Sequence, residues 1–143
     1  IERLDGDVVR ESLTKDLGFS KEDRDKNIER VTFVAKLLSR NNVGVLASFI
    51  SPYAATRQYV SDQTTNFLEV YVSTPLEVCE DRDVKGMYAK ARTGEIKNFT
   101  GISDPYEVPV NPDIEVPTHE QTLEESVDFL VAELEKRGYL PQG

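Results

Sequence analysis

The clearest helical pattern in the chain begins at Ser20. Asp23 follows three residues later, a spacing that predicts a helix N-terminus closed by a capping box. Apolar residues then recur at helical spacing and end near Arg40. We expect them to form one buried stripe, made by Ile28, Val31, Val34, Ala35 and Leu38.

Short apolar runs alternate with helical segments in the next part of the chain. Val43–Ile50 is nearly continuous in apolar residues, which is typical of a strand covered on both faces. A helix is expected from Ala54 to Gln63, and Phe67–Val72 is a second β-rich run. Thr74-Pro75 then begins another helix, with proline near its first position. This alternation predicts an α/β fold with a parallel sheet.

The chain opens on what resembles the end of a strand. Ile1–Leu4 has the pattern of a strand terminus, and Asp5-Gly6-Asp7 follows at its carboxyl edge. A helix is expected from Asp7 to Leu17, with Gly18 ending it.

The C-terminal half is less regular. Arg82–Ile96 is polar and helical in propensity, while Phe99–Pro117 is a long irregular stretch holding four prolines. Loops of this length are usually functional or disordered. Thr122 and Glu125 form a second capping box, and the amphipathic helix behind it ends at Gly138. Without an internal repeat or a linker, residues 1–143 are expected to form a single domain.

Composition and charge exclude some classes of protein. With 38% hydrophobic and 30% charged residues, the balance is that of a soluble globular domain. No apolar stretch approaches the roughly 20 residues of a membrane span, and no secretory signal is visible. The net charge of −9 argues against a nucleic-acid partner. Cys79 is the only cysteine, so no internal disulfide can form, and a cytoplasmic location fits.

One segment departs from this acidic balance. Between Arg82 and Lys97 there are five basic residues and only two acids. The segment either binds a small anion or is an ordinary solvated helix face.

Two further places could carry chemistry. Asp5-Gly6-Asp7 is either a magnesium and hydroxyl site at a strand end or a common turn. Arg10 and Arg24 suit bidentate binding of phosphate or sulfate. Phe19, between them, could stack on a base or pack as a hydrophobic staple.

Ser51 and His119 complete the candidates. Ser51 follows an apolar strand and could offer its hydroxyl or N–H to a ligand, or simply cap a helix. His119 is the only histidine and lies in a polar loop, so we expect it at the surface. No cluster of histidine and cysteine suggests zinc.

Taken together, several motifs resemble the adenylylsulfate kinase family, whose members phosphorylate the 3′-hydroxyl of adenosine 5′-phosphosulfate with ATP. Their order and spacing run through nearly the whole chain. They are Leu4-Asp-Gly-Asp-Val-Val-Arg10, Asp16-Leu-Gly-Phe-Ser20, Asp23-Arg-Asp-Lys-Asn-Ile28, Phe49-Ile-Ser-Pro-Tyr53, Pro75-Leu-Glu-Val-Cys79, Arg82-Asp-Val-Lys-Gly86 and Ala89-Lys-Ala-Arg-Thr-Gly-Glu-Ile-Lys-Asn-Phe-Thr-Gly-Ile102.

The resemblance implies a P-loop kinase fold, in which a parallel sheet is flanked by helices and a helical lid covers about residues 82–102. It implies that Asp5 lies near magnesium and the reacting hydroxyl. It also implies that Ser51 belongs to the catalytic centre, at a position often described in the family as a phosphoserine. Direct in-line transfer needs only positioning and charge stabilisation, so we do not expect a covalent intermediate.

The resemblance also assigns binding residues. Phe19 would stack on the adenine, with Phe99 on its other side. The remaining contacts to adenylylsulfate would come from Asp7, Arg10, Arg24, Asn27, Ile50, Ser51, Lys85 and Asn98. The nucleotide and lid residues would be Arg82, Lys90 and Arg92.

The implied function is formation of 3′-phosphoadenosine 5′-phosphosulfate, with ATP as co-substrate and Mg²⁺ as cofactor. A homodimer and an association with ATP sulfurylase would fit. The family's Gly-x-x-x-x-Gly-Lys-Ser/Thr loop does not occur among the eight glycines here. We expect it before Ile1, and the 143 residues alone should be an inefficient kinase. A binding module without that loop, regulating a partner, is the alternative. Another small-molecule kinase of the same fold is a third reading, which the motifs around Phe19 and Phe99 disfavour.

Overall fold

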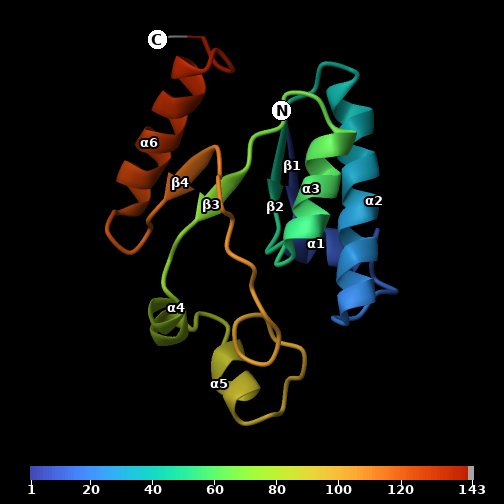
Figure 1. The fold of residues 1–143 in the computed structure, drawn as a ribbon, viewed down its shortest axis with the longest axis vertical. Helices are drawn as coiled ribbons and strands as arrows, with labels where there is room; N and C mark the ends of the chain where they lie inside the picture. Colours follow the sequence, from blue (N-terminus) through green and yellow to red (C-terminus); the bar gives the residue numbers. More distant parts are fainter. Residues whose placement is uncertain (142–143) are drawn as a thin grey trace. The chain divides into compact units, whose positions relative to one another are not determined.

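The computed structural model describes residues 1–141 and divides into two compact units (Figure 1). The first unit is Ile1–Phe67 with Lys97–Val108. The second is Leu68–Ile96 with the described residues from Pro109 onward. Each unit contains one pair of parallel strands and its own helices.

The first unit is built on two parallel strands, β1 (Glu2–Asp5) and β2 (Val45–Ser48). Glu2 lies opposite Val45 and Asp5 opposite Ser48, so both strands end at the same edge. Helix α1 (Gly6–Glu11) starts directly at that edge.

The other two helices of the first unit are α2 (Lys21–Ser39) and α3 (Ala54–Gln63). They lie side by side, and α2 also contacts β2 (Figure 1). The core of this unit is small, with Val9, Ile28 and Val31 among its buried residues.

The second unit pairs β3 (Val70–Val72) with β4 (Ile114–Val116), again in parallel. Ile114 and Val116 are buried, and α6 (Leu123–Lys136) packs beside β4. Two short helices, α4 (Leu76–Arg82) and α5 (Met87–Arg92), complete it.

Much of the predicted architecture is confirmed. The Ser20 hydroxyl accepts the Asp23 N–H and caps α2, whose apolar stripe begins with the buried Ile28. Helix α3 has the predicted bounds, and Thr122 with Glu125 forms the predicted capping box of α6. The α/β class with parallel strands is therefore confirmed.

The prediction for the first helix was wrong. Helix α1 ends at Glu11 rather than Leu17, because the Thr14 N–H and hydroxyl both turn back to the Val9 carbonyl. Thr14 is fully buried in this turn. The Asp23 carboxylate does not complete the predicted capping box, because it accepts the Gly18 N–H instead.

Two predicted elements of the second unit also differ. The helix expected over Arg82–Ile96 is broken, because the chain turns at Gly86 with φ of +65°. The Asp83 carboxylate then accepts the N–H groups of Tyr88 and Ala89 and caps α5. Strand β4, with Glu115 between two buried apolar residues, lies inside the stretch predicted to be irregular.

The strand predicted over Val43–Ile50 is shorter and less covered than expected. It forms only at Val45–Ser48, and Leu46 is 53% exposed. Its one strand neighbour among the described residues is β1, and α2 covers only part of it. The second β-rich run is also shorter, at Val70–Val72. No helix among residues 1–141 is long and apolar enough to cross a membrane.

Candidate functional site

The carboxyl edge of β1 and β2 brings together the first candidate residues. Asp5 ends β1 and caps α1, because its Oδ1 accepts the Asp7 N–H at 3.0 Å. A Cβ on Gly6 would lie 3.2 Å from the Ser48 carbonyl oxygen, so glycine lets α1 start tightly against β2. Asp5 is thereby fixed at a strand end, where open α/β sheets bind their ligands.

Ser51 lies three residues beyond the end of β2, in a strained conformation. Its φ is +44°, which side-chain-bearing residues rarely adopt, at a cost of about 1–3 kcal/mol. Arg57 holds it there: Nη1 donates to the Ser51 carbonyl at 2.8 Å and Nη2 donates to the Glu107 carbonyl at 2.6 Å. The neighbouring Ile50 is 63% exposed. Strain maintained by a specific clamp is typical of functional positions.

Phe19 is the centre of a second group of candidates. The guanidinium carbon of Arg10 lies 4.4 Å from the ring centroid and that of Arg24 lies 5.6 Å from it. The ring is 50% exposed, so it is not a buried staple, and its partner one turn into α2 is Arg24 rather than an apolar residue. An accessible aromatic ring beside two cations suits a flat ligand with an anionic tail.

Arg10 is positioned by the turn that ends α1. Its Nη1 donates to the carbonyls of Leu17 and Gly18, at 3.3 and 3.2 Å. Partial burial and the charge of Arg24 lower the pKa of Arg10, while Asp23 acts in the opposite direction. The charged form of Arg10 is thus disfavoured beside Phe19, as expected where an anion is to be received.

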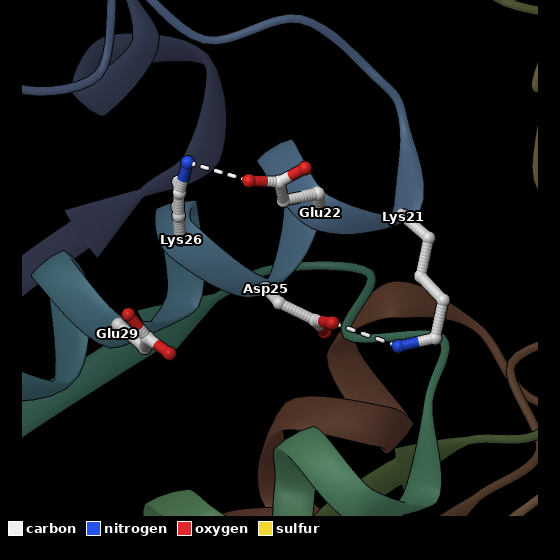
Figure 2. Close-up of a pocket in the computed structure, with 5 residues that line it drawn as sticks. All are labelled: Lys21, Glu22, Asp25, Lys26 and Glu29. Carbon is white, nitrogen blue, oxygen red and sulfur yellow. Dashed lines mark hydrogen bonds and ion pairs between the residues drawn. The ribbon is translucent and has the colours of Figure 1, made fainter.

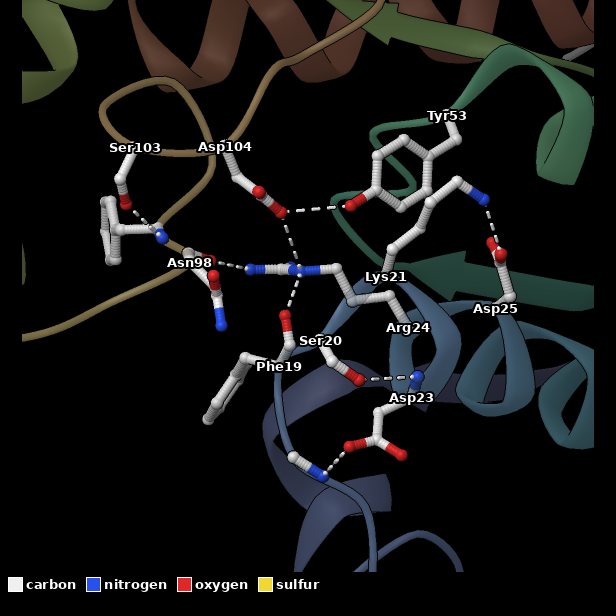
Figure 3. A network of polar contacts seen from close by, with 12 residues as sticks. Phe19, Ser20, Lys21, Asp23, Arg24, Asp25, Tyr53, Asn98, Ser103 and Asp104 are labelled. Carbon is white, nitrogen blue, oxygen red and sulfur yellow. Dashed lines mark hydrogen bonds and ion pairs between the residues drawn. The ribbon is translucent and has the colours of Figure 1, made fainter.

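Arg24 joins Phe19 to the loop of residues 97–108 (Figure 3). Its Nε donates to the Phe19 carbonyl at 3.0 Å and its Nη2 donates to the Asn98 carbonyl at 2.7 Å. Asn98 has φ of +55°, and the Phe99 N–H donates to the Ser103 hydroxyl. The structure therefore brings both predicted aromatic segments to one arginine.

Asn27 lies one turn after Arg24 and is only 5% exposed. Its Oδ1 is buried and accepts no hydrogen bond among the described residues, and the same holds for the Thr100 Oγ1. A buried polar atom left without a partner costs about 1–3 kcal/mol, which a bound ligand or water can recover.

The remaining predicted residues belong to the second unit. Arg92 makes a bidentate pair with Glu80, at 2.6 and 2.9 Å, and Arg82 donates to the Thr118 carbonyl. Lys90 lies 3.7 Å from Glu95. Lys85 is exposed. His119 is exposed at the surface, as predicted.

A shallow pocket lies along the first half of α2 and is lined by residues of that helix (Figure 2). Four of its five lining residues pair within the helix, Lys21 with Asp25 and Lys26 with Glu22, each at 2.8 Å, while the fifth, Glu29, is exposed. Such pairs between residues four apart are common on solvated helices, so this pocket is not a candidate site. Among residues 1–141, no three His, Cys, Asp or Glu side chains gather to hold a metal ion.

Sequence reasoning missed three residues that organise the site: Tyr53, Asp104 and Glu107. Tyr53 is 4% exposed and its hydroxyl donates to the Asp104 Oδ2 at 3.0 Å. Burial and the Asp104 carboxylate raise the pKa of Tyr53, so the hydroxyl keeps its proton. The Glu107 Oε2 accepts the Ala54 N–H and caps α3. No local pattern signals these pairs, because the partners lie about 50 residues apart.

Comparison with known proteins gives a consistent family. A family model described as adenylylsulphate kinase matches residues 1–117. The chain is 79% identical to a probable adenylyl-sulfate kinase of Pseudomonas aeruginosa over 92% of its length, and spans 61% of that relative. It is 61% identical to an adenylyl-sulfate kinase of Halothermothrix orenii, covering 98% of this chain and 76% of that protein.

The structural comparison agrees. The Mycobacterium tuberculosis APS kinase CysC, in complex with AMPPNP and APS, superimposes with a TM-score of 0.88 at 44% identity. The match covers 93% of this chain and 79% of that one.

Proposed function

The chain belongs to the adenylylsulfate kinase family, and from that premise we propose that its protein transfers the γ-phosphoryl group of ATP to the 3′-hydroxyl of adenosine 5′-phosphosulfate. The products are ADP and 3′-phosphoadenosine 5′-phosphosulfate. The chain spans less than two thirds of the Pseudomonas aeruginosa relative, so the activity is proposed for the whole protein.

The observation that carries the proposal is the environment of Phe19. A half-exposed ring lies beside the guanidinium groups of Arg10 and Arg24, and Arg24 also holds the segment of Asn98 and Phe99. An adenine can stack on an aromatic ring, and the phosphosulfate anion can meet the cations. Asn27, with its buried free acceptor, can take a hydrogen bond from the same ligand.

The strand edge supplies the catalytic groups in this proposal. We propose that Asp5 orients the 3′-hydroxyl and accepts its proton, while Ile50 and Ser51 hold the substrate from just beyond the end of β2. Asp7, exposed at the start of α1, makes a further contact. The strain at Ser51 serves positioning and does not require a covalent phosphoserine.

Mg²⁺ fits this edge as an ion shared with the nucleotide. Asp5 uses Oδ1 to accept the Asp7 N–H, and Mg²⁺ usually takes only one or two protein carboxylates beside substrate phosphates. When bound, the ion would neutralise charge on the transferred phosphoryl group.

The family's phosphate loop has no counterpart among these 143 residues. We propose that the loop lies in a part of the protein that extends beyond them, as the relatives do. Residues 82–102, with Arg82, Lys85, Lys90 and Arg92, are proposed as the lid that closes over ATP and excludes water.

By analogy with the family, we also propose that the protein forms a homodimer and associates with ATP sulfurylase. A cytoplasmic location fits the single free thiol of Cys79.

A coupled assay of the full-length protein tests the function. ADP release should require both ATP and adenylylsulfate, and the product should carry a 3′-phosphate by mass spectrometry and nuclease digestion. Adenylylsulfate binding with no ADP release would instead support a binding module. Equal ADP release with AMP in place of adenylylsulfate would contradict the proposed substrate.

A further inference from the structure

Asp104 is the one acidic side chain in Figure 3 that meets both Tyr53 and Arg24. Its Oδ2 accepts the Tyr53 hydroxyl at 3.0 Å and lies 3.9 Å from the Arg24 Nε. The side chains of Arg24 and Asp104 are only 11% and 21% exposed. A carboxylate so little exposed, between a hydroxyl donor and a guanidinium, has a defined position.

The backbone of Asp104 is fixed to Phe99. Its N–H donates to the Phe99 carbonyl at 3.0 Å, and its own carbonyl accepts the Gly101 N–H at 2.8 Å. The Phe99 carbonyl also accepts the N–H groups of Ile102 and Ser103. Residues 99–104 therefore form a closed turn, and moving Asp104 moves Phe99 with it.

We propose that Asp104 is a positioning residue for adenylylsulfate binding, acting with Tyr53 to hold Arg24 and the Asn98–Phe99 segment in place. The inference rests on the proposed function and extends it to residues outside the proposed substrate contacts. Tyr53 is buried beside the N-terminus of α3 and serves as the fixed point. From it, the contacts run through the Asp104 carboxylate to Arg24, which holds the carbonyls of Phe19 and Asn98.

The loop has a second attachment that separates positioning from folding. The Glu107 N–H donates to the Pro52 carbonyl, its Oε2 accepts the Ala54 N–H, and its carbonyl accepts from Arg57. Loss of the Asp104 carboxylate thus leaves the loop attached at Glu107 and removes the link to Tyr53 from the end that carries Asn98 and Phe99, which then depends on Arg24. The proposal predicts weaker adenylylsulfate binding without a matching loss of the fold.

Calorimetric titration of the full-length protein with adenylylsulfate, and separately with AMPPNP, tests this. Asp104→Ala should weaken adenylylsulfate binding by about tenfold or more, the range of a lost charge-assisted hydrogen bond. The adenylylsulfate affinity of Asp104→Asn should lie between those of the wild type and Asp104→Ala, because its amide oxygen still accepts from Tyr53 but carries no charge. Tyr53→Phe should show a smaller loss in the same direction. AMPPNP affinity and kcat at saturating adenylylsulfate should change little.

Thr122→Ala is the matched control, because it removes the cap of α6 and lowers the melting temperature without touching these residues. It should leave adenylylsulfate affinity unchanged. If Asp104→Ala lowered only the melting temperature, with adenylylsulfate affinity intact, or weakened both ligands equally, the positioning role would be wrong. If the wild-type protein did not bind adenylylsulfate at all, the proposed function and this inference would both fall.

Discussion

The loop of residues 97–108 and the segment of residues 76–96 are held in opposite ways. The loop reaches far along the sequence for its partners. Asp104 meets Tyr53, Asn98 meets Arg24, and the Glu107 carboxylate meets the N-terminus of α3. These partners lie 51 to 74 residues away, so the loop is ordered only when the first unit is folded.

The segment of residues 76–96 is held mostly by its neighbours, apart from Arg82, which donates to the Thr118 carbonyl. Arg92 pairs with Glu80, and the Asp83 carboxylate caps the next helix. Helix α4 has no buried residue, and Val84 is 92% exposed. Local hydrogen bonds and exposed side chains are features of regions that open at low free-energy cost.

This difference matches the two tasks in the proposed reaction. The groups proposed to receive adenylylsulfate are already held by hydrogen bonds without it, which would reduce the ordering cost of binding. The proposed lid residues up to Ile96 carry few contacts that closure would have to break. A loop without regular structure is thus the more constrained of the two regions.

The largest effect is expected at Asp5, at the end of β1 in the first unit. Asp5→Asn should lower kcat by roughly 10²–10⁴-fold, the range for loss of a general base, with a small change in adenylylsulfate affinity. Asparagine is as good an N-cap as aspartate, so α1 should stay intact. Steady-state kinetics with both substrates, beside a circular dichroism melt, measures this. A rise in KM alone would remove Asp5 from the catalytic step.

Phe19 should come next. Phe19→Ala should weaken adenylylsulfate binding by roughly 5- to 150-fold, since base–aromatic stacking is worth about 1–3 kcal/mol. Phe33→Ala is the matched control, because Phe33 is 69% exposed on α2 and lies outside the proposed site. Titration calorimetry should show a loss only for Phe19, and equal affinities would contradict the stacking role.

Substitutions of Arg57 test whether the site residues of the first unit depend on the two hydrogen bonds that its guanidinium donates. Arg57→Ala removes donors to the carbonyls of Ser51 and Glu107 and should cost about 1–2 kcal/mol of unfolding free energy. Adenylylsulfate affinity should fall as the strained Ser51 relaxes. Arg57→Lys keeps the charge but cannot bridge both carbonyls, so it should recover only part of the stability in urea unfolding. Full recovery would show that charge alone matters.

The smallest effect is expected in residues 76–96. The hydrogen bond from Arg92 lowers the pKa of Glu80 below its ordinary value, so this pair stabilises the fold at neutral pH. Its contribution should disappear as the pH falls through the lowered pKa. Arg92→Gln should therefore lower the melting temperature slightly at pH 7, with the difference vanishing in acid.

The matched variant Glu80→Gln separates two roles of Arg92. If Arg92 serves only to pair with Glu80, both variants should change the KM for ATP by the same small amount. A much higher KM in Arg92→Gln alone would support its proposed place in the nucleotide site.

The sequence predicted those features that depend on near neighbours. The cap at Ser20, the bounds of α3, and the capping box of Thr122 and Glu125 are all local, and all are confirmed. The end of α1 was missed because Thr14 turns back on Val9, against the helical propensity of the residues around it. Strand β4 was missed because it is three residues long among prolines.

The site was predictable only in part, and mainly through family motifs. Asp5, Phe19 and Arg24 stand out by residue type, but nothing in the sequence pairs Arg24 with the Asn98 carbonyl, 74 residues away. Tyr53 lies in one of the family motifs but had no role assigned to it, and Asp104 gave no signal, since an Asp-Pro turn is ordinary in loops. Every residue has a backbone carbonyl, so the sequence does not indicate which carbonyl a given side chain will bind.

Hydrogen exchange of the full-length protein, with and without adenylylsulfate, tests the contrast between the two regions most directly. In the free protein, the amides of Phe99 and residues 102–104 should exchange slowly, because each donates within the closed turn. Amides of residues 83–96 should exchange faster and gain the most protection when adenylylsulfate and AMPPNP are bound together. Rapid exchange of residues 99–104 in the free protein, with slow exchange of residues 83–96, would contradict the account.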